Sequence, residues 1–319
     1  MRKAKVGILF DIDGVLWKKP DVFPFTLNTM KKVIHHNIPY LYVTNGGGSP
    51  DNIKCLDYSQ RLGLTIDESQ IILSHTPLKS LLQDFKDRLF LVSGSGDPVG
   101  IAKYYGLNRV VNTADVISAY PNTWPFKSIH KEKGYDGSCE FVRNYDPSNV
   151  EGIAVLNDGQ CWGSEFQVIV DALIFGKKGD NMDHPPIFFS NADRVWKTSH
   201  EHSRFAQGMY NSCIKNCYKQ MTNKDITPIQ CGKPTLLTFN YAKERLLMKA
   251  KEMGYDDINE YYMIGDNPES DIRGANNIGW KSVLLRSGVY DGIMNSENPT
   301  TIQDNVSNAI DWIFKEHNI

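Results

Sequence analysis

The chain has 319 residues, of which 35 are basic, 37 are acidic and 41% are hydrophobic, and its formal net charge is −2. This length predicts a core domain plus one further unit. The balanced charge gives no indication of a polyanion-binding surface, so we expect no nucleic acid partner. No window approaches the roughly 20 unbroken apolar residues that a bilayer span needs, so we expect no membrane partner either. Six cysteines without a CxxC pair are typical of reduced thiols rather than of a disulfide framework.

The first residues of the chain bear on its location. The segment MRKAKVGILF runs from a few basic side chains directly into an apolar strand, which leaves no room for a removable presequence. As given, the sequence therefore predicts a cytoplasmic protein. A mitochondrial location would require a native presequence that is missing from this chain.

Strands and helices alternate in the first and last thirds of the chain. Strands are predicted over residues 6–10, 40–43, 260–264 and 282–285. Helices are predicted over residues 24–36, 50–62, 234–253, 269–276 and 308–315. Alternation of this kind predicts an α/β fold with a doubly wound, Rossmann-like parallel sheet.

Predicted strands and helices also alternate in the middle of the chain. Strands are predicted over residues 89–92, 152–156 and 187–189, and helices over 161–175 and 205–219. Two linkers rich in turn-forming and charged residues, at 121–147 and 176–186, predict that the loosest structure lies here. We therefore expect a core made of residues 1–83 and 231–319, with an inserted α/β unit at residues 84–230.

Two short polar motifs follow predicted strands in the first 50 residues, at the edge where open α/β sheets bind ligands. In DIDG, Asp11 and Asp13 place two carboxylates just where the first strand stops, although an acidic turn before glycine would look the same. In TNGGG, a hydroxyl, an amide and glycine N–H groups can approach an anion, although a flexible turn is the alternative. The residues concerned are Thr44, Asn45 and Gly46.

Two further motifs lie in the last third of the chain. Lys233 in GKP precedes a predicted helix, so its ammonium and the helix N-terminus can face one phosphate, unless the side chain is simply solvated. In GDNPESD, Asp266 and Asp271 offer oxygen ligands suited to a hard cation, unless Asp266 only caps a helix. Because all four motifs follow strands of one sheet in this order, together they favour a phosphate and metal site.

The order DxDGVL, TNG, GKP and GDNPxSD resembles the haloacid dehalogenase (HAD) superfamily of aspartate-nucleophile phosphotransferases. The fuller pattern is similar to subclass IIA, the nitrophenylphosphatase-like group, which carries a large C2-type cap between the second and third motifs. Segments 74–82, 190–196 and 203–210 further resemble the eukaryotic branch homologous to the cat eye syndrome critical region protein. The resemblance implies a HAD core with residues 84–230 as an inserted α/β C2 cap that determines substrate specificity.

The resemblance also implies a Mg²⁺-dependent phosphatase that hydrolyses a small phosphorylated metabolite through an aspartyl-phosphate intermediate. Asp11 would be the nucleophile, Asp13 the general acid and base, and Lys233 the cation that neutralises Asp11 and phosphate together. Phosphate would be bound by Thr44, Asn45, Gly46 and Lys233. Mg²⁺ would be held by Asp11, the Asp13 backbone carbonyl and Asp266, with Asp271 orienting the metal shell.

Other interpretations of the same residues stay open. One is a phosphotransferase with an acceptor other than water, and another is a low-turnover binding or scaffold protein, against which the complete set of carboxylates argues. In the cap, Asp193, Trp196 and Arg204 are expected to determine substrate specificity. Phe205, Met209 and Tyr210 are interpreted, together with Trp196, as pocket lining rather than core packing. A homodimer through the cap also remains open.

Overall fold

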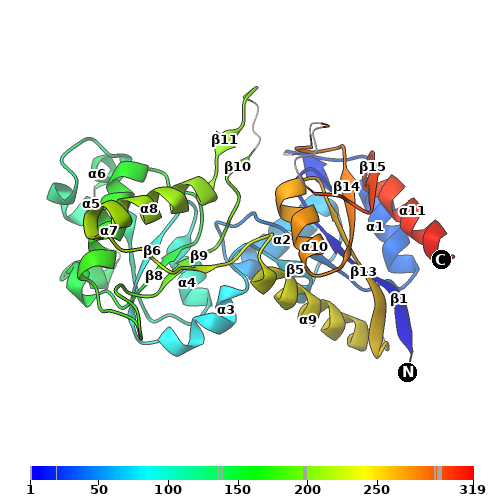
Figure 1. Ribbon diagram of the computed structural model, residues 1–319, viewed down its shortest axis with the longest axis horizontal. Helices are drawn as coiled ribbons and strands as arrows, with labels where there is room; N and C mark the ends of the chain where they lie inside the picture. The colour runs from blue at the N-terminus through cyan, green and yellow to red at the C-terminus, as the bar shows by residue number, and fades with distance from the viewer. Residues whose placement is uncertain are drawn as a thin grey trace. The chain divides into compact units, whose positions relative to one another are not determined.

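The structure is a computed structural model that describes residues 2–18, 20–134, 137, 139–196, 200–290, 292 and 297–319. The chain divides into two compact units (Figure 1). The first unit consists of Met1–Gly46, Asp51–Ser74 and Gly232–Ile319, and the second of Gly47–Pro50 and His75–Cys231. Within the described ranges, none of the helices combines the length and the apolar character that a membrane span requires.

The first unit is built on a six-stranded, fully parallel sheet with the order β15-β14-β13-β1-β4-β5. Its strands are β1 (Lys3–Phe10), β4 (Tyr40–Val43), β5 (Ile71–Ile72), β13 (Asp257–Gly265), β14 (Lys281–Leu285) and β15 (Thr301–Gln303). A short antiparallel hairpin, β2 (Trp17–Lys18) and β3 (Asp21–Val22), follows β1. The order reverses at β1, because the chain adds β4 and β5 on one side and β13 to β15 on the other. This arrangement confirms the doubly wound core.

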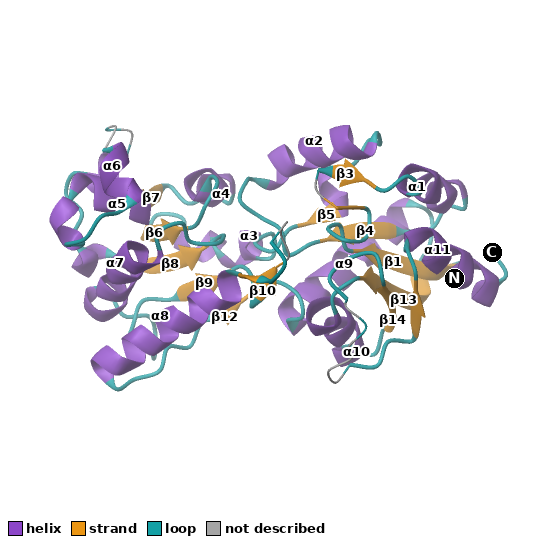
Figure 2. Cartoon of the chain, turned by 90° about the horizontal axis from the view of Figure 1, so that it is seen from above, coloured by secondary structure: helices purple, strands orange, loops and turns teal. Residues whose placement is uncertain are grey.

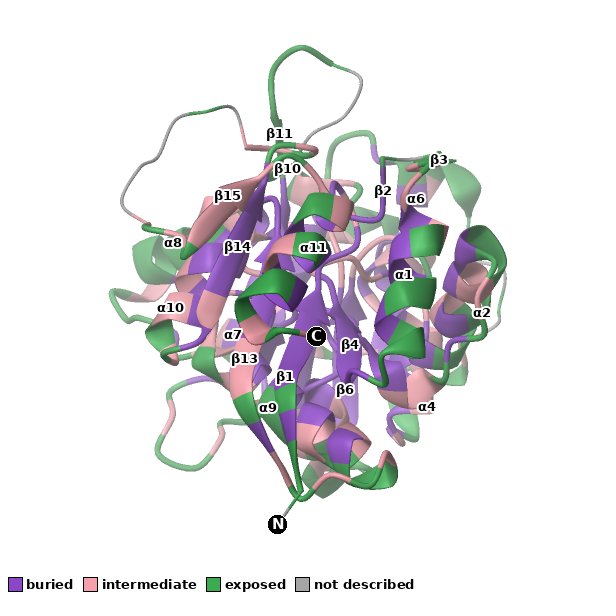
Figure 3. Cartoon of the chain, turned by 90° about the vertical axis from the view of Figure 1, so that its right-hand side faces the viewer, coloured by how far each residue is buried: buried purple, intermediate pink, exposed green. Residues whose placement is uncertain are grey.

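Helices cover both faces of this sheet, which explains why β1 is apolar along most of its length. Ile8 and Phe10 pack with α1 (Thr26–His35) and α11 (Val306–His317). Leu9 packs on the opposite face with α9 (Leu236–Glu252) and α10 (Arg273–Asn277). Figure 1 shows these two helical layers, and Figure 3 shows β1 and β4 buried between them. The helices of this unit are α1 (Thr26–His35), α2 (Asp51–Leu62), η1 (Glu68–Gln70), α9 (Leu236–Glu252), the π-helical turn η6 (Pro268–Ile272), α10 (Arg273–Asn277) and α11 (Val306–His317).

The second unit has a parallel sheet of its own, with the order β12-β9-β8-β6-β7 (Figure 2). Its strands are β6 (Leu89–Ser93), β7 (Arg109–Asn112), β8 (Gly152–Val155), β9 (Ile187–Phe189) and β12 (Ile229–Gln230), with the hairpin β10 (Val195–Trp196) and β11 (Arg204–Phe205). Its helices are α3 (Leu78–Leu81), η2 (Gln83–Phe85), α4 (Pro98–Tyr104), α5 (Thr113–Ala119), η3 (Pro121–Thr123), α6 (Ile129–Lys133), η4 (Glu140–Val142), η5 (Pro147–Asn149), α7 (Trp162–Phe175) and α8 (Gln207–Thr222).

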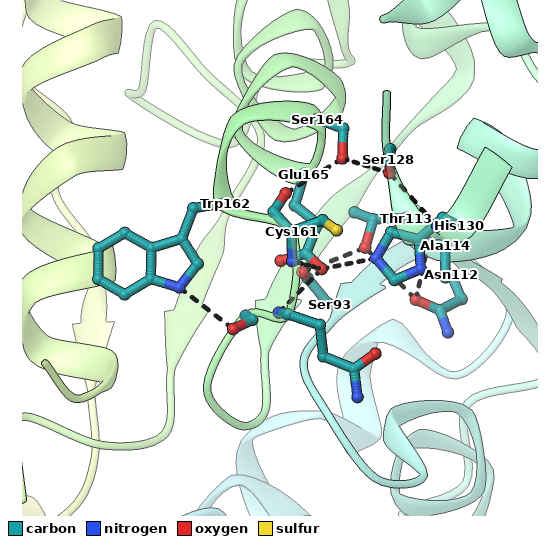
Figure 4. A network of polar contacts seen from close by, with 12 residues as sticks. Ser93, Asn112, Thr113, Ala114, Ser128, His130, Cys161, Trp162, Ser164 and Glu165 are labelled. Carbon is teal, nitrogen blue, oxygen red and sulfur yellow. Dashed lines mark hydrogen bonds and ion pairs between the residues drawn. The ribbon is translucent and has the colours of Figure 1, made fainter. Parts of the chain in front are cut away.

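Glu165, in the first turn of α7, is the centre of a buried polar network in the second unit (Figure 4). Its Oε1 lies 2.8 Å from Nε2 of His130 and accepts hydrogen bonds from the backbone N–H groups of Gln160 and Cys161. Its Oε2 accepts a hydrogen bond from the hydroxyl of Tyr210 at 3.0 Å. The network therefore joins α6, α7, α8 and the loop before α7.

The border between the units differs from the one expected at residues 83 and 84. Residues 75–83 belong to the second unit, where His75 Nδ1 lies 2.6 Å from the hydroxyl of Tyr105 and Gln83 Nε2 donates to the Tyr105 carbonyl. Residues 47–50 also belong there, because the backbone N–H of Asp97 donates to the carbonyl of Gly48 at 2.9 Å. On the other side, Cys231 closes the second unit and Gly232 resumes the first.

Two further expectations for the second unit need correction. The linker expected at 121–147 contains α6 and short 3-10 turns, and the buried His130 anchors α6 to Glu165. Tyr210 is fully buried in the core of this unit, so it does not line an open pocket.

Candidate active site

Lys233 lies between two carboxylates at the carboxyl edge of the first sheet. Its Nζ is 2.7 Å from Oδ1 of Asp11 and 2.6 Å from Oδ1 of Asp271, and all three side chains are buried. Asp11 directly follows β1, and its backbone N–H donates to the carbonyl of Ile264 in β13. The neighbouring strands therefore place the Asp11 carboxylate at the point where the strand order reverses, where open α/β sheets bind ligands.

Asp271 is aimed inward by the π-helical turn η6, a local geometry that is frequent at functional sites. Its second oxygen, Oδ2, accepts a hydrogen bond from the backbone N–H of Asn267 at 3.0 Å. Gly265 allows this approach, because a Cβ added there would lie 2.2 Å from Cγ of Asp271. The glycine that opens GDNPESD is therefore a packing requirement of the site.

Asp266 is held by the loop after β14. Its Oδ2 accepts a hydrogen bond from the backbone N–H of Val289 at 2.7 Å. A Cβ added to Gly288 would lie 1.8 Å from this oxygen, and one added to Gly14 would lie 2.2 Å from it. Gly14 also has a φ of +81°, which L side chains rarely adopt. Two glycines thus let the backbone close tightly around the Asp266 carboxylate.

Asp11, Asp266 and Asp271 form a compact acidic cluster, with one oxygen of each carboxylate within 4.8 Å of the others. Burial raises the pKa of Asp11 to about 7, although the ammonium of Lys233 opposes this shift. Burial and the charges of Asp11 and Asp271 raise the pKa of Asp266 well above its usual range. Burial disfavours the charged form of Lys233, but the two adjacent carboxylates outweigh it and raise its pKa above the usual range.

The charges of this cluster fit a divalent cation. With all three carboxylates ionised, the single ammonium would leave an excess of two negative charges in this buried site, which a bound divalent cation would offset. The donors are hard oxygen atoms, which suit Mg²⁺ rather than a soft metal. Burial is the largest cause of the raised pKa values of Asp11 and Asp266, and the charges of neighbouring carboxylates raise them further.

Asp13 stands apart from this cluster, since its carboxylate is not among the three that converge. Its Oδ1 accepts a hydrogen bond from the indole Nε1–H of Trp17 at 2.7 Å. The side chain is therefore oriented by the hairpin that follows β1. The metal role expected at this position concerned its backbone carbonyl, which is independent of the carboxylate.

The residues after β4 bring the TNG motif to the same edge of the sheet. Thr44 is buried, and its Oγ1 accepts a hydrogen bond from the backbone N–H of Gly46 at 3.0 Å. Asn45 Oδ1 accepts from the backbone N–H of Lys233 at 2.7 Å, and Asn45 Nδ2 donates to the Lys233 carbonyl at 2.9 Å. The structure thus joins the second and third motifs directly.

In the second unit, the three expected specificity residues gather around the β10–β11 hairpin. Trp196 pairs with Arg204 across the hairpin, and both are exposed. The indole Nε1–H of Trp196 donates to the Phe205 carbonyl at 3.0 Å. Asp193 precedes β10, and its carbonyl accepts from the backbone N–H of Gly208 in α8. Residues 197–199, between the two strands, lie outside the described residues.

The sequence patterns did not single out two features of the site. Trp17 lies in the DIDGVLW segment, but no local pattern assigns a role to its indole. No motif includes Val289 or Gly288, although a glycine three residues after a core strand is a signal for close backbone approach at the ligand-binding edge. Both features depend on side-chain and loop geometry that local patterns do not encode.

Known proteins are similar to this chain in sequence and in fold. A family model described as haloacid dehalogenase-like hydrolase matches residues 8–108, and one described as HAD-hydrolase-like matches residues 230–309. The chain is 32% identical over 328 residues to a cardiolipin synthase (CMP-forming) / mitochondrial hydrolase fusion protein of Schizosaccharomyces pombe. That alignment covers 98% of this chain and 54% of the relative, so the chain spans about half the length of the fusion protein.

Two further comparisons cover nearly all of both proteins. The chain is 28% identical over 335 residues to a mitochondrial hydrolase of Saccharomyces cerevisiae, covering 96% of this chain and 94% of that one. The structure of a p-nitrophenyl phosphatase from Archaeoglobus fulgidus covers 97% of this chain and 99% of that chain, with a TM-score of 0.66 and 16% identity. This structural likeness shows a shared two-unit fold.

Proposed function

Because the chain belongs to the haloacid dehalogenase-like hydrolases, we propose that it is a Mg²⁺-dependent phosphatase of subclass IIA that hydrolyses a small phosphorylated metabolite. The buried cluster of Asp11, Lys233, Asp266 and Asp271 carries this proposal. A phosphate dianion can approach a carboxylate nucleophile only where positive charges and backbone dipoles offset the repulsion. The p-nitrophenyl phosphatase activity named for the similar structure supports the same reaction class.

In the proposed reaction, a carboxylate oxygen of Asp11 attacks phosphorus while the phosphorus–oxygen bond of the ester breaks. Asp13 gives its proton to the leaving alcohol oxygen. Asp13 then removes a proton from water, the water oxygen attacks phosphorus, and the bond between phosphorus and Asp11 breaks. Inorganic phosphate leaves, and Asp11 and Asp13 return to their starting states.

The remaining residues bind and orient. Lys233 balances the charge of Asp11, and Thr44, Asn45 and Gly46 form the proposed phosphate-binding loop. Asp11, Asp266 and the Asp13 backbone carbonyl would hold Mg²⁺, with Asp271 fixing the arrangement through Lys233. The bound ion would supply Lewis-acid stabilisation of phosphoryl charge.

The second unit is proposed to be the C2-type cap that determines substrate specificity. Its exposed Trp196 and Arg204 offer an aromatic face and a cation that would contact the leaving group rather than phosphorus. The expected homodimer through this unit stays a prediction.

The experiment that tests the function is phosphate release from p-nitrophenyl phosphate, with and without Mg²⁺, by the wild-type protein and by Asp11→Asn. The proposal requires Mg²⁺-dependent release that the variant lacks. Equal release by both proteins, or none by either at any Mg²⁺ concentration, would contradict it. A screen of phosphorylated metabolites then identifies the substrate by its kcat/KM.

A mitochondrial location is also proposed for this chain. This proposal is supported by the two related proteins, because the names of both include the words mitochondrial hydrolase. Fractionation of cells that produce the complete natural protein from its own gene tests this. Recovery in the cytosolic fraction alone would favour the location that the sequence as given predicts.

A further inference from the structure

Trp17 holds one oxygen of the proposed general acid. Its indole Nε1–H donates to Oδ1 of Asp13 at 2.7 Å, and the indole is almost completely buried. Indole is a donor only and cannot accept a proton from a carboxyl group. In a protonated carboxyl group the carbonyl oxygen is the better acceptor, so the contact with the indole favours Oδ1 as that carbonyl oxygen. The acidic proton is then favoured on the other oxygen, Oδ2.

The indole is itself fixed by its neighbours in the first unit. The ring of Tyr58 packs edge-on against it with centroids 4.9 Å apart, and the guanidinium of Arg61 lies over it at 5.9 Å. The backbone N–H of Gly14 donates to the Trp17 carbonyl at 2.7 Å, which closes the turn between Asp13 and Trp17. The ring and the backbone of Trp17 are thus both fixed, so its indole N–H points at Asp13 before any substrate binds.

The second oxygen of Asp13 faces the proposed phosphate loop. A Cβ added to Gly46 would lie 3.9 Å from Oδ2 of Asp13, which places this oxygen next to the TNG motif. Fixing Oδ1 on the indole therefore directs Oδ2 toward the side where the phosphoryl group would be bound. The contact with Trp17 thus opposes rotation of the Asp13 carboxyl group about its Cβ–Cγ bond, which would exchange the two oxygens.

We propose that Trp17 is a positioning residue that makes Oδ2 of Asp13 the oxygen that exchanges protons. Oδ2 gives its proton to the ester oxygen as the bond between Asp11 and phosphorus forms and the ester bond breaks. It takes a proton back from water as the aspartyl phosphate is hydrolysed. This inference rests on the proposed phosphatase function and adds a residue to which that function assigned no role.

Leaving-group dependence separates positioning from general structural damage. Trp17→Phe keeps a ring against Tyr58 but removes the N–H donor. For an alkyl phosphate, whose leaving oxygen needs a proton, kcat/KM should fall by about 10-fold or more. For p-nitrophenyl phosphate, whose leaving oxygen is a weak base, it should fall by less than about 3-fold. Equal losses on both esters, or no loss on either, would overturn the proposal.

Trp280→Phe is the matched control, because Trp280 is buried in the same unit and stacks on Tyr261 outside the site. It should leave kcat/KM unchanged for both esters. If Trp17→Phe fails to fold, the sulfur analogue of tryptophan, 3-benzothienylalanine, is placed at position 17 instead. This residue has nearly the shape of tryptophan but no N–H donor, so the same ratio between the two esters is measured.

A spectroscopic measurement tests the contact without turnover. In a ¹⁵N–¹H spectrum, the indole signal that disappears in Trp17→Phe belongs to Trp17, and donation to a carboxylate should move it downfield. Asp13→Asn should shift that signal upfield, whereas the indole signal of Trp280 should not move. An unmoved Trp17 signal would refute the contact. Absence of phosphatase activity in the wild-type protein would refute the proposed function instead, so the two failures are distinguishable.

Discussion

Asn45 and Lys233 are 188 positions apart, yet the side-chain amide of Asn45 binds both polar groups of the Lys233 backbone. Its Oδ1 accepts from the N–H at 2.7 Å, and its Nδ2 donates to the carbonyl at 2.9 Å. The lysine that contacts Asp11 is therefore held at its backbone by the motif proposed to bind phosphate. The TNG and GKP motifs therefore fix each other's position through direct hydrogen bonds.

The first prediction concerns this pair. Asn45→Ala should lower kcat/KM by about 10-fold or more, because the Lys233 backbone loses both partners and its ammonium shifts relative to Asp11. Stability should fall by about 1–3 kcal/mol, the cost of leaving such groups unpaired. Steady-state kinetics and urea unfolding measure the two effects. Asn108→Ala, which removes an exposed bond to Asp87, is the control and should change neither. Unaltered kinetics in Asn45→Ala would contradict this prediction.

The second prediction concerns the nucleophile. Asp11→Asn should reduce turnover on the order of 10⁴-fold or more, because an amide of the same shape is a poor nucleophile. The pKa of Asp11 is about 7 in the folded state and 3.8 in the reference state, so its ionisation opposes folding above about pH 4. Without metal, the variant should therefore be more stable than the wild type at pH 8. The difference should shrink toward pH 4, as thermal melting at several pH values will show. If the metal-free wild type is instead more stable than Asp11→Asn at pH 8, the predicted direction of this stability difference is wrong.

The third prediction concerns the metal. Because the acidic cluster carries excess negative charge, Mg²⁺ should stabilise the folded protein, by about 2.7 kcal/mol at 100 times its Kd. Thermal melting of chelator-treated protein during Mg²⁺ titration measures this effect. Asp266→Asn should lose most of the stabilisation, whereas the exposed Asp304→Asn should keep it. Activity should disappear with the chelator and return with Mg²⁺, and rescue by Zn²⁺ alone would contradict the assignment.

The expectation that all four motifs follow strands of one sheet is wrong for GKP, because Lys233 comes after β12, a strand of the second unit's sheet. The other three motifs could be predicted from sequence because each directly follows an apolar strand of the first sheet. Asp11 after β1 and Asp266 after β13 are examples, since neighbouring parallel strands bring their carboxyl ends together. The bond from Trp17 to Asp13 could not be predicted, because it depends on the rotamer of one side chain. The pairing of Asn45 with the Lys233 backbone could not be predicted either, because it is a long-range contact between two loops.

Some features of the fold could not be predicted from the sequence, each for its own physical reason. The edge strand Ile71–Ile72 has two residues, too few to show any alternation. The strand Arg109–Asn112 was missed for a similar reason, because its polar ends leave only two apolar residues between them. The border near residue 75 has no local signal, because the helix Leu78–Leu81 has two leucines alternating with polar residues. The contacts of His75 and Gln83 with Tyr105 lie within the second unit.

The fourth prediction concerns the buried network of the second unit. Burial alone would raise the pKa of Glu165, but hydrogen bonds from His130, Tyr210 and two backbone N–H groups lower it below its usual value of 4.5. A carboxyl group with a lowered pKa stabilises the fold above its unfolded pKa, and this contribution is lost as the pH falls through the folded pKa. Glu165→Gln should therefore cost about 3 kcal/mol at pH 7 and progressively less below pH 4.5.

Urea unfolding of the second unit at several pH values measures this cost, with tryptophan fluorescence as the signal. The exposed Glu132→Gln in the same unit is the control and should have little effect at any pH. A destabilisation by Glu165→Gln that is the same at pH 7 and pH 4 would show that hydrogen-bond geometry, rather than the charge of Glu165, stabilises the network.

The last prediction concerns the β10–β11 hairpin, where Trp196 and Arg204 face each other across the strands and are both exposed. Neither side chain belongs to the acidic cluster, so each should affect substrate choice rather than the phosphoryl transfer step. Trp196→Ala and Arg204→Ala should each change the preference among phosphate esters, mainly through KM and by about 10-fold for esters with large leaving groups. A small aryl phosphate should keep a similar kcat, because it offers little surface for the hairpin to contact. Met221→Ala, which removes an exposed apolar side chain from α8 of the same unit, is the control and should leave the preference unchanged. If both hairpin variants instead lose kcat equally on every ester while remaining folded, the hairpin acts in the chemical step, and the proposed division of roles between the two units is wrong.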